Sequence, residues 1–206
     1  MLIEGTVREL LAALASADPT PGGGSASALA SAMGASLLAM VAGLPKTRSG
    51  SDEDRAALGA AAAVLADVRQ GLADAIDADT AAYDRVVSAY KLPKTSEAEQ
   101  SARKAAIQRG LRAATDVPLT VMQLSALALA QAPVVARHGH KAALSDAGVA
   151  VALLGAGLRG AGLNVEINLG GLSDEVYVGT ARAESARLTM EGERDRLAAD
   201  AALAGG

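Results

Sequence analysis

The sequence contains no cysteine, no phenylalanine and no tryptophan, and only three tyrosines among its 206 residues. The absence of cysteine excludes disulfides, thiol nucleophiles and thiolate metal sites. With so few aromatic side chains, a core must come from many small contacts between closely packed elements. Alanine and leucine are abundant instead, and long β-branched alternation is missing, so we expect an all-α protein. The length fits a single domain, 1–206, with a substantial core.

Strong charge of either sign is also missing. The formal net charge is -4 and the isoelectric point is about 5.2. The chain lacks the basic stripe that a nucleic-acid backbone requires, so we expect no nucleic-acid partner. Its first residues, Met1 to Glu4, lack the basic segment and apolar run of a signal peptide. We therefore expect a cytoplasmic protein.

Two uncharged stretches, 22–45 and 117–136, are long enough to raise the question of a membrane span. The first consists mainly of alanine, glycine and serine, and the second contains two prolines and two glutamines. The mean hydropathy of +0.24 is low for a membrane protein. We expect both stretches to be buried helices of a bundle, with no membrane partner.

The periodicity and the helix-breaking residues predict a bundle of long helices, which we expect to be antiparallel. Pro118 either begins a helix or kinks a continuous one. The segment 164–171 alternates like a strand but has no partner strand, so we expect it to continue the preceding helix or to form an irregular turn. The expected helices cover 3–16, 26–44, 52–90, 97–114, 142–163 and 173–203.

A glycine-rich turn, Pro21-Gly22-Gly23-Gly24-Ser25, opens into an uncharged helix of small residues expected from Ala26. Glycine lets another group approach the peptide planes closely, and the first turn of a helix presents unpaired N–H groups at its positive dipole end. An anionic or carbonyl-rich ligand would bind well there. The spacing matches neither the phosphate-binding loop nor the dinucleotide-binding motif. A tight corner between closely packed helices is the alternative, and the local motif leaves both open.

Asp79 lies in an apolar stripe of the helix expected over 52–90. Asp77, by contrast, falls on a side with several other carboxylates, which is most simply a solvated surface. A buried carboxylate must be paired, hydrogen-bonded or protonated, and burial raises its pKa toward the range useful for proton transfer. Asp79 is thus either a candidate acid or base, or a structural residue satisfied by a neighbouring helix end. It shares its face, at three- and four-residue spacing, with Leu65, Val68, Leu72, Ile76, Tyr83, Val86 and Tyr90.

Two pairs of polar residues are weaker candidates. Asn164 and Asn168 would lie one turn apart on a helix, where their amides could grip a heterocycle or satisfy local backbone groups. Lys91 and Lys94 lie in a short loop, where they could meet an anionic group or simply aid solubility. Nothing local decides between these interpretations.

Five short motifs follow one another along nearly the whole chain: Pro21-Gly22-Gly23-Gly24-Ser25-Ala26-Ser27-Ala28-Leu29, Asp77-Ala78-Asp79-Thr80-Ala81-Ala82-Tyr83, Leu92-Pro93-Lys94, Ser145-Asp146 and Asn164-Val165-Glu166-Ile167-Asn168-Leu169. Each is weak alone, but their joint order and spacing resemble the cyclodeaminase/cyclohydrolase family. This family is the cyclodeaminase half of formiminotransferase-cyclodeaminase, and it also occurs alone as bacterial methenyltetrahydrofolate cyclohydrolase.

The resemblance implies an all-α subunit that forms a homodimer and binds a reduced folate, which can be polyglutamylated. It implies no cofactor beyond this tetrahydrofolate-derived substrate. It places the aspartate needed for catalysis at Asp79, the residue that the apolar stripe selects independently, with Asp77 in reserve. It implies that Lys91 and Lys94 both contact a glutamate tail of the folate. The remaining folate-binding residues implied are Pro21, Gly22, Gly23, Gly24, Ser25, Tyr83, Asn164 and Asn168.

The sequence departs from the family pattern before Ser145, where His138-Gly139-His140-Lys141 replaces a turn that contains glycine and asparagine. The two histidines resemble a fragment of a metal site. No further histidine or cysteine is present in the chain, so a site there would need carboxylates. We expect no metal.

The resemblance implies formimino-tetrahydrofolate cyclodeaminase, which forms methenyltetrahydrofolate and releases ammonia, as the leading function. The alternative is methenyltetrahydrofolate cyclohydrolase. Both reactions need a group that removes a proton from the attacking atom and returns it to the leaving nitrogen, which one carboxylate can do without a metal. A non-enzymatic alternative is a catalytically inactive helical protein that binds folate or acts as a scaffold.

Overall fold

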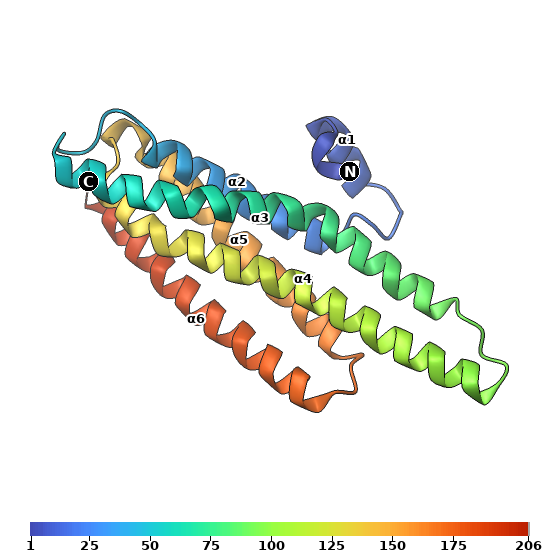
Figure 1. Cartoon of the computed structure of the whole chain (residues 1–206). Helices are drawn as coiled ribbons and strands as arrows, with labels where there is room; N and C mark the ends of the chain where they lie inside the picture. The colour runs from blue at the N-terminus through green and yellow to red at the C-terminus, as the bar shows by residue number, and fades with distance from the viewer. Residues whose placement is uncertain (206) are drawn as a thin grey trace.

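The computed structural model describes residues 1–205, and every regular element within them is helical (Figure 1). Short loops join consecutive long helices, which lie side by side. The all-α expectation is therefore confirmed. The elements are the 3-10 turn η1 (Leu2–Glu4), α1 (Val7–Leu14), α2 (Gly23–Ala42), α3 (Asp52–Tyr90), α4 (Glu97–His138), the 3-10 turn η2 (Lys141–Ala143), α5 (Leu144–Leu169) and α6 (Glu175–Ala204).

The expected first helix over 3–16 is wrong. Gly5 separates η1 from the short helix α1 in extended backbone, and Thr6 then begins α1 with a capping box. The Thr6 hydroxyl accepts from the Glu9 N–H at 3.2 Å, and the Glu9 carboxylate accepts from the Thr6 N–H at 2.7 Å. Because these reciprocal bonds satisfy the first orphan donors of α1, the helix begins only after Gly5.

The second helix begins three residues earlier than expected. Gly22 is the N-terminal cap in extended backbone, and Gly23 and Gly24 already belong to α2. The interpretation of three glycines as a turn is therefore corrected: two of them lie in the first turn of the helix. Helix α2 lies against α3 and α5, and its buried face consists largely of glycine, alanine and serine.

Small residues allow the close approach that the sequence predicts. A Cβ on Gly34 would lie 2.7 Å from the carbonyl oxygen of Ala150 on α5, closer than a side chain tolerates. The fully buried hydroxyls of Ser31 and Ser125 hydrogen-bond to each other at 2.7 Å and join α2 to α4. Their mutual bond offsets the cost of burying two polar groups.

Helix α4 continues through Pro118 and Pro133, so the alternative of one continuous helix is the correct one. Proline lacks an N–H, which leaves the carbonyl of Ala114, four residues before Pro118, without its helical donor. The side-chain amide of Asn168 on α5 donates to that oxygen at 2.7 Å. The segment up to Leu169 is helical, which confirms the expected continuation of α5.

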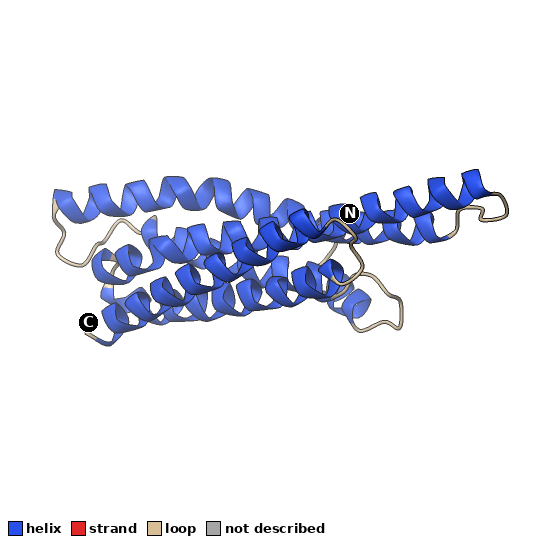
Figure 2. Cartoon of the chain, turned by 90° about the horizontal axis from the view of Figure 1, so that it is seen from below, coloured by secondary structure: helices blue, strands red, loops and turns tan. Residues whose placement is uncertain are grey.

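The α3–α4 hairpin extends past the other helices (Figures 1 and 2). At 1.5 Å per residue, the 39 residues of α3 span about 58 Å, whereas the 20 residues of α2 span about 30 Å. Asp79 faces the first turn of α2, so the last turns of α3 lie beyond α2. The candidate site lies where α2 begins and α3 continues past it, a position called here the step in the bundle.

Four helical segments are long and apolar enough to cross a membrane, by length and composition alone: α2, α3, α4 and 141–169. In the bundle, 56% of the relevant stretch of α2 is buried against its neighbours. Its buried residues include three serines, Ser25, Ser27 and Ser31, which hydrogen-bond within the protein. This packing accounts for the uncharged composition of α2, and the absence of a membrane partner stays a prediction.

Candidate active site

Three helices converge around Asp79. The N–H and the hydroxyl of Ser25 on α2 lie 2.8 Å and 3.0 Å from Oδ2 of Asp79. Gly24 lies directly against the carboxylate, because a Cβ there would overlap Oδ1 and would lie 2.7 Å from Oδ2. On α5, the amide of Asn164 lies beside Gly23, within 3.4 Å of where a Cβ would stand. The structure thus brings Asp79 together with part of the glycine motif and one of the two asparagines.

The first turn of α2 explains why a carboxylate lies there. Gly22 has no side chain to cap the helix, so its first N–H groups need an acceptor from elsewhere. The carboxylate of Asp79 supplies that acceptor from α3, and the positive end of the helix dipole favours its charge. The two interpretations of the glycine motif therefore combine: the glycines permit close packing, and the helix end binds an anion that belongs to the protein itself.

Burial raises the pKa of Asp79 above its ordinary value, and the two hydrogen bonds from Ser25 partly oppose that rise. Asp79 has no salt-bridge partner among residues 1–205. Desolvation therefore outweighs the stabilisation of the charged form. A half-buried carboxyl with a raised pKa is suited to accept and return a proton.

Asp77 does not lie on a freely solvated surface, and that expectation is corrected. Its carboxylate accepts from the backbone N–H groups of Leu2 and Ile3 and is half-buried. Asp77 thus holds the N-terminal segment against α3. The two carboxylates of the Asp-x-Asp motif have different partners, and only Asp79 lies at the start of α2.

The two asparagines also differ. Asn164 donates to the carbonyl of Gly160 in its own helix at 2.9 Å and lies beside the first turn of α2. The amide nitrogen of Asn168 donates to the carbonyl of Ala114, which lacks its helical donor because of Pro118. Folate binding by Asn168 stays a prediction, and its N–H group already has a structural use.

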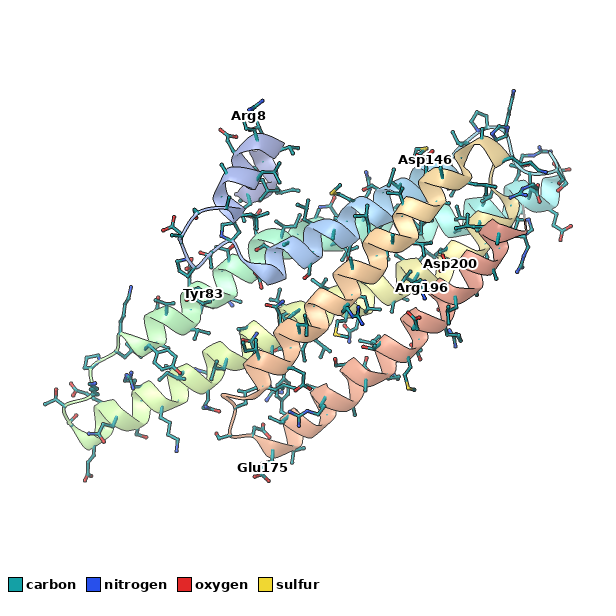
Figure 3. All side chains as sticks on the ribbon, turned by 180° about the vertical axis from the view of Figure 1, so that it is seen from behind. Arg8, Tyr83, Asp146, Glu175, Arg196 and Asp200 are labelled. Atoms are coloured by element: carbon teal, nitrogen blue, oxygen red, sulfur yellow. The ribbon has the colours of Figure 1, made fainter. Side chains whose placement is uncertain are left out.

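Tyr83 lies one turn beyond Asp79 on α3, where the hairpin leaves the body of the bundle (Figure 3). It is 39% exposed and accessible to a ligand. Pro21 and Gly22 are half-buried in the segment that leads into α2. A role for Pro21, Gly22 and Tyr83 in folate binding stays a prediction.

Lys91 and Lys94 are exposed at the tip of the hairpin. Lys91 is twelve residues after Asp79, so it lies about 18 Å away along the direction of α3. A cavity of about 340 Å³ on the hairpin is lined by Lys94, Arg103 and Lys104, among others. Sequence reasoning did not single out Arg103 and Lys104, which are adjacent in the charged start of α4.

The histidine pair has structural partners. Nδ1 of His138 lies 2.7 Å from Oδ1 of Asp54, and Nδ1 of His140 accepts from the N–H of Ala142. Within residues 1–205 no group of three or more histidine, aspartate or glutamate side chains is placed to hold a metal ion. Sequence reasoning missed the pair of His138 and Asp54, which are 84 residues apart.

Together these features define a class of protein: an all-helical bundle with a half-buried carboxylate that caps a neighbouring glycine-rich helix. The sequence model of the formiminotransferase-cyclodeaminase family matches residues 6–187. The chain belongs to this family, which confirms the resemblance seen in the motifs.

Two relatives and one solved structure illustrate the relationship. The chain is 42% identical over 172 residues to methenyltetrahydrofolate cyclohydrolase from Methylorubrum extorquens, covering 84% of this chain and 83% of that protein. It is 30% identical over 190 residues to formimidoyltransferase-cyclodeaminase from Rattus norvegicus, covering 92% of this chain but 35% of that protein. The chain thus spans about a third of the length of this second relative.

The crystal structure of formiminotetrahydrofolate cyclodeaminase from Thermotoga maritima superposes with a TM-score of 0.88. It is 25% identical to this chain, and the match covers 100% of this chain and 98% of that one. The fold is therefore shared along the whole chain.

Proposed function

We propose that this protein is a methenyltetrahydrofolate cyclohydrolase that uses Asp79 as its general acid and base. The raised pKa and one-sided hydrogen bonding of Asp79 are the observations that carry the catalytic role. The choice of reaction rests on the cyclohydrolase relative, which is more similar than the rat protein and matches over most of its own length. This choice reverses the order expected from the sequence, which put the cyclodeaminase first.

In the proposed reaction, water adds to the methenyl carbon, which bridges two nitrogens of the folate. Asp79 accepts a proton from the attacking water and delivers it to the leaving nitrogen as its bond to carbon breaks. The remaining hydroxyl proton goes to solvent as the formyl group forms. A single carboxyl group is sufficient for these transfers, so we propose that no cofactor or metal takes part.

Formimino-tetrahydrofolate cyclodeaminase is the second candidate, supported by the full-length structural match to the Thermotoga maritima protein. In that reaction the second folate nitrogen attacks the formimino carbon and ammonia leaves. The same carboxyl would move the proton from the attacking nitrogen to the leaving one. The two reactions differ in the attacking group, and pocket geometry selects between them.

The folate would bind along the step beside α2. We propose that its reacting carbon lies next to Asp79 and that the first turn of α2, Asn164 and Tyr83 line the pocket. The glutamate tail would then point along α3 toward the hairpin. Lys91, Lys94 and the cations of the hairpin cavity, Arg103 and Lys104, would attract a polyglutamate chain.

We also propose that the chain forms a homodimer. Large apolar side chains are exposed on α2 and α5: Met33 is 49% exposed, Met40 42%, Leu163 69% and Ile167 76%. A second copy that covered them would enlarge a core that lacks large aromatic residues. Sedimentation of the purified protein tests this, and a monomer at micromolar concentration would contradict it.

Assays of both purified substrates test the proposed function. Methenyltetrahydrofolate should be hydrolysed well above the spontaneous rate, in the presence of a chelator, with the higher kcat/KM of the two. Faster release of ammonia from formimino-tetrahydrofolate would instead establish the second candidate. If neither substrate reacts but reduced folate raises the Tm, the chain is a folate-binding protein without catalysis.

A further inference from the structure

The two oxygens of the Asp79 carboxylate have unequal surroundings. The N–H and the hydroxyl of Ser25 are both within hydrogen-bond distance of Oδ2. The hydroxyl also lies 2.9 Å from the carbonyl oxygen of Ile76. Within residues 1–205 no hydrogen bond reaches Oδ1. One carboxylate oxygen is thus anchored and the other is without a donor.

The unbonded oxygen is still accessible. In the part of the chain that the structure describes, the hydroxyl of Thr80 is the one fully buried side-chain polar atom without a partner. Oδ1 of Asp79 also lacks a hydrogen-bond partner. Because it is not among the fully buried atoms, it keeps some contact with solvent. Oδ1 keeps this exposure although Gly24 lies against it, whereas the N–H and the hydroxyl of Ser25 hold Oδ2.

The hydroxyl of Ser25 has one proton and two acceptors within reach, Oδ2 of Asp79 and the carbonyl of Ile76. When Asp79 is ionised, donation to the carboxylate gives the stronger, charge-assisted bond. When Asp79 is protonated on Oδ1, the hydroxyl can rotate to the Ile76 carbonyl without leaving a donor unpaired. Ser25 can therefore satisfy both protonation states without moving its backbone.

We infer that Ser25 is a positioning residue that holds Oδ2 of Asp79 and reserves Oδ1 for the transferred proton. This inference rests on the proposed role of Asp79 as acid and base. Ser25 itself is buried, with 1% of its surface exposed, and acts through the carboxylate. Its effect should therefore appear in the protonation of Asp79 before it appears in substrate binding.

No charged side chain competes with Ser25 for control of Asp79. The first turn of α2 is uncharged, and only burial and Ser25 contribute to the pKa shift of Asp79. Asp77 on the same helix accepts from the N-terminal segment. On α4 and α5, Arg112, Asp116 and Glu166 instead pair with the α6 segment. Removal of the Ser25 hydroxyl should therefore change the pKa of Asp79 directly.

The test is the pKa of Asp79 in the folate-free protein, measured by carboxyl NMR with ¹³C-labelled aspartate. Asp79→Asn identifies the resonance. Ser25→Ala should raise this pKa by about one pH unit, because a hydrogen bond to the charged form is lost while the backbone N–H remains. The acidic limb of the kcat/KM profile should move by the same amount, with little change in KM.

Ser27→Ala is the matched control. Ser27 is also buried on α2, but its hydroxyl donates to the carbonyl of Gly23 at 2.6 Å, so the Asp79 pKa should stay at the wild-type value. An unchanged pKa in Ser25→Ala, or an equal shift in both variants, overturns the inference. Because this readout needs no substrate, it is independent of whether the proposed reaction is correct.

A second measurement avoids any dependence on the folding of a variant. In an atomic-resolution crystal structure of the wild-type protein below the pKa of Asp79, the protonated C–O bond is the longer one. The inference predicts lengthening of the bond to Oδ1. Lengthening of the bond to Oδ2 overturns it.

Discussion

Two carboxylates of α3 that are shielded from bulk water differ sharply in their partners: Asp54 in the first turn of the helix and Asp79 nearer its C-terminal end. Asp54 is 6% exposed, and both of its oxygens have partners: Oδ1 lies 2.7 Å from His138, and Oδ2 accepts from the N–H and hydroxyl of Ser49. The backbone and side-chain bonds from Ser49 and His138 hold the pKa of Asp54 well below its ordinary value. The pKa of Asp79 is raised.

Shielding from water does not by itself raise the pKa of a carboxylate, because the pKa of the buried Asp54 is lowered. Donors on both oxygens fix Asp54 in its ionised form, and it joins the loop before α3 to the end of α4. Asp79 has donors on one oxygen only, so desolvation dominates its pKa. The number and placement of donors accompany the opposite pKa shifts of the two carboxylates.

The largest expected effect is on turnover in Asp79→Asn. The amide oxygen can still accept from Ser25, so the site should keep its shape while proton transfer is lost. Turnover should fall by about 10²–10⁴-fold, measured with the purified variant on both substrates. Activity within a few-fold of wild type would remove Asp79 from the mechanism.

The stability of the same variant sharpens the comparison. A raised pKa means that the folded state binds the proton more tightly than the unfolded chain, so stability falls as the pH rises from the ordinary carboxyl pKa through the raised one. At pH 7 the ionised Asp79 is thus destabilising, and Asp79→Asn should keep or raise the Tm. A clearly lower Tm at pH 7 would assign Asp79 a structural role like that of Asp54.

Gly24→Ala should break the site while leaving the helix intact. Its methyl group would overlap Oδ1 of Asp79 and displace the carboxylate, and a shift of about 1 Å can cost about 10²-fold in rate. Gly59→Ala is the control, because no atom lies within 4 Å of a Cβ there. That change should raise stability by about 1 kcal/mol with unchanged kcat/KM, whereas equal kinetics in both variants would contradict the account.

At the other end of α3, Asp54→Asn should lower stability and leave catalysis alone. A lowered pKa stabilises the fold above the ordinary carboxyl pKa, and this contribution is lost as the pH falls from the ordinary carboxyl pKa through the lowered one. The Tm at pH 7 should drop by a few degrees, with less further loss on acidification than in wild type. A large fall in kcat at a temperature where the variant is folded would show that the two ends are coupled.

The smallest effect is expected from the asparagines. Asn168→Ala leaves the Ala114 carbonyl without a donor and should cost about 1 kcal/mol of stability, with little change in KM. Asn164→Ala should show the reverse, a raised KM with a nearly unchanged Tm. Denaturant unfolding and steady-state kinetics check both, and a larger KM effect from Asn168 would assign it to the pocket after all.

The sequence predicts much of this site because helical periodicity is local. Spacing along α3 places Asp79 among apolar residues and Asp77 on another face, and the family motifs point to the same carboxylate. The positions of the long helices follow from the same periodicity and from the residues that interrupt it. The expected starts of the first two helices are wrong, because the N-terminal caps Thr6 and Gly22 set where these helices begin.

The partners of these residues were beyond the reach of sequence reasoning. Ser25 meets Asp79 across 54 residues, and this contact depends on α2 beginning at Gly23 and lying against α3. The continuity of α4 through Pro118 likewise depends on Asn168 of another helix. Such contacts are set by tertiary packing, which overrides local propensity.

A crystal structure with a non-reactive reduced folate bound tests the central claim most directly. The account predicts Oδ1 of Asp79 within about 2.6–3.2 Å of a folate nitrogen that borders the one-carbon bridge, or of a water between them. A folate bound with its bridging carbon beyond the reach of Asp79 would contradict it.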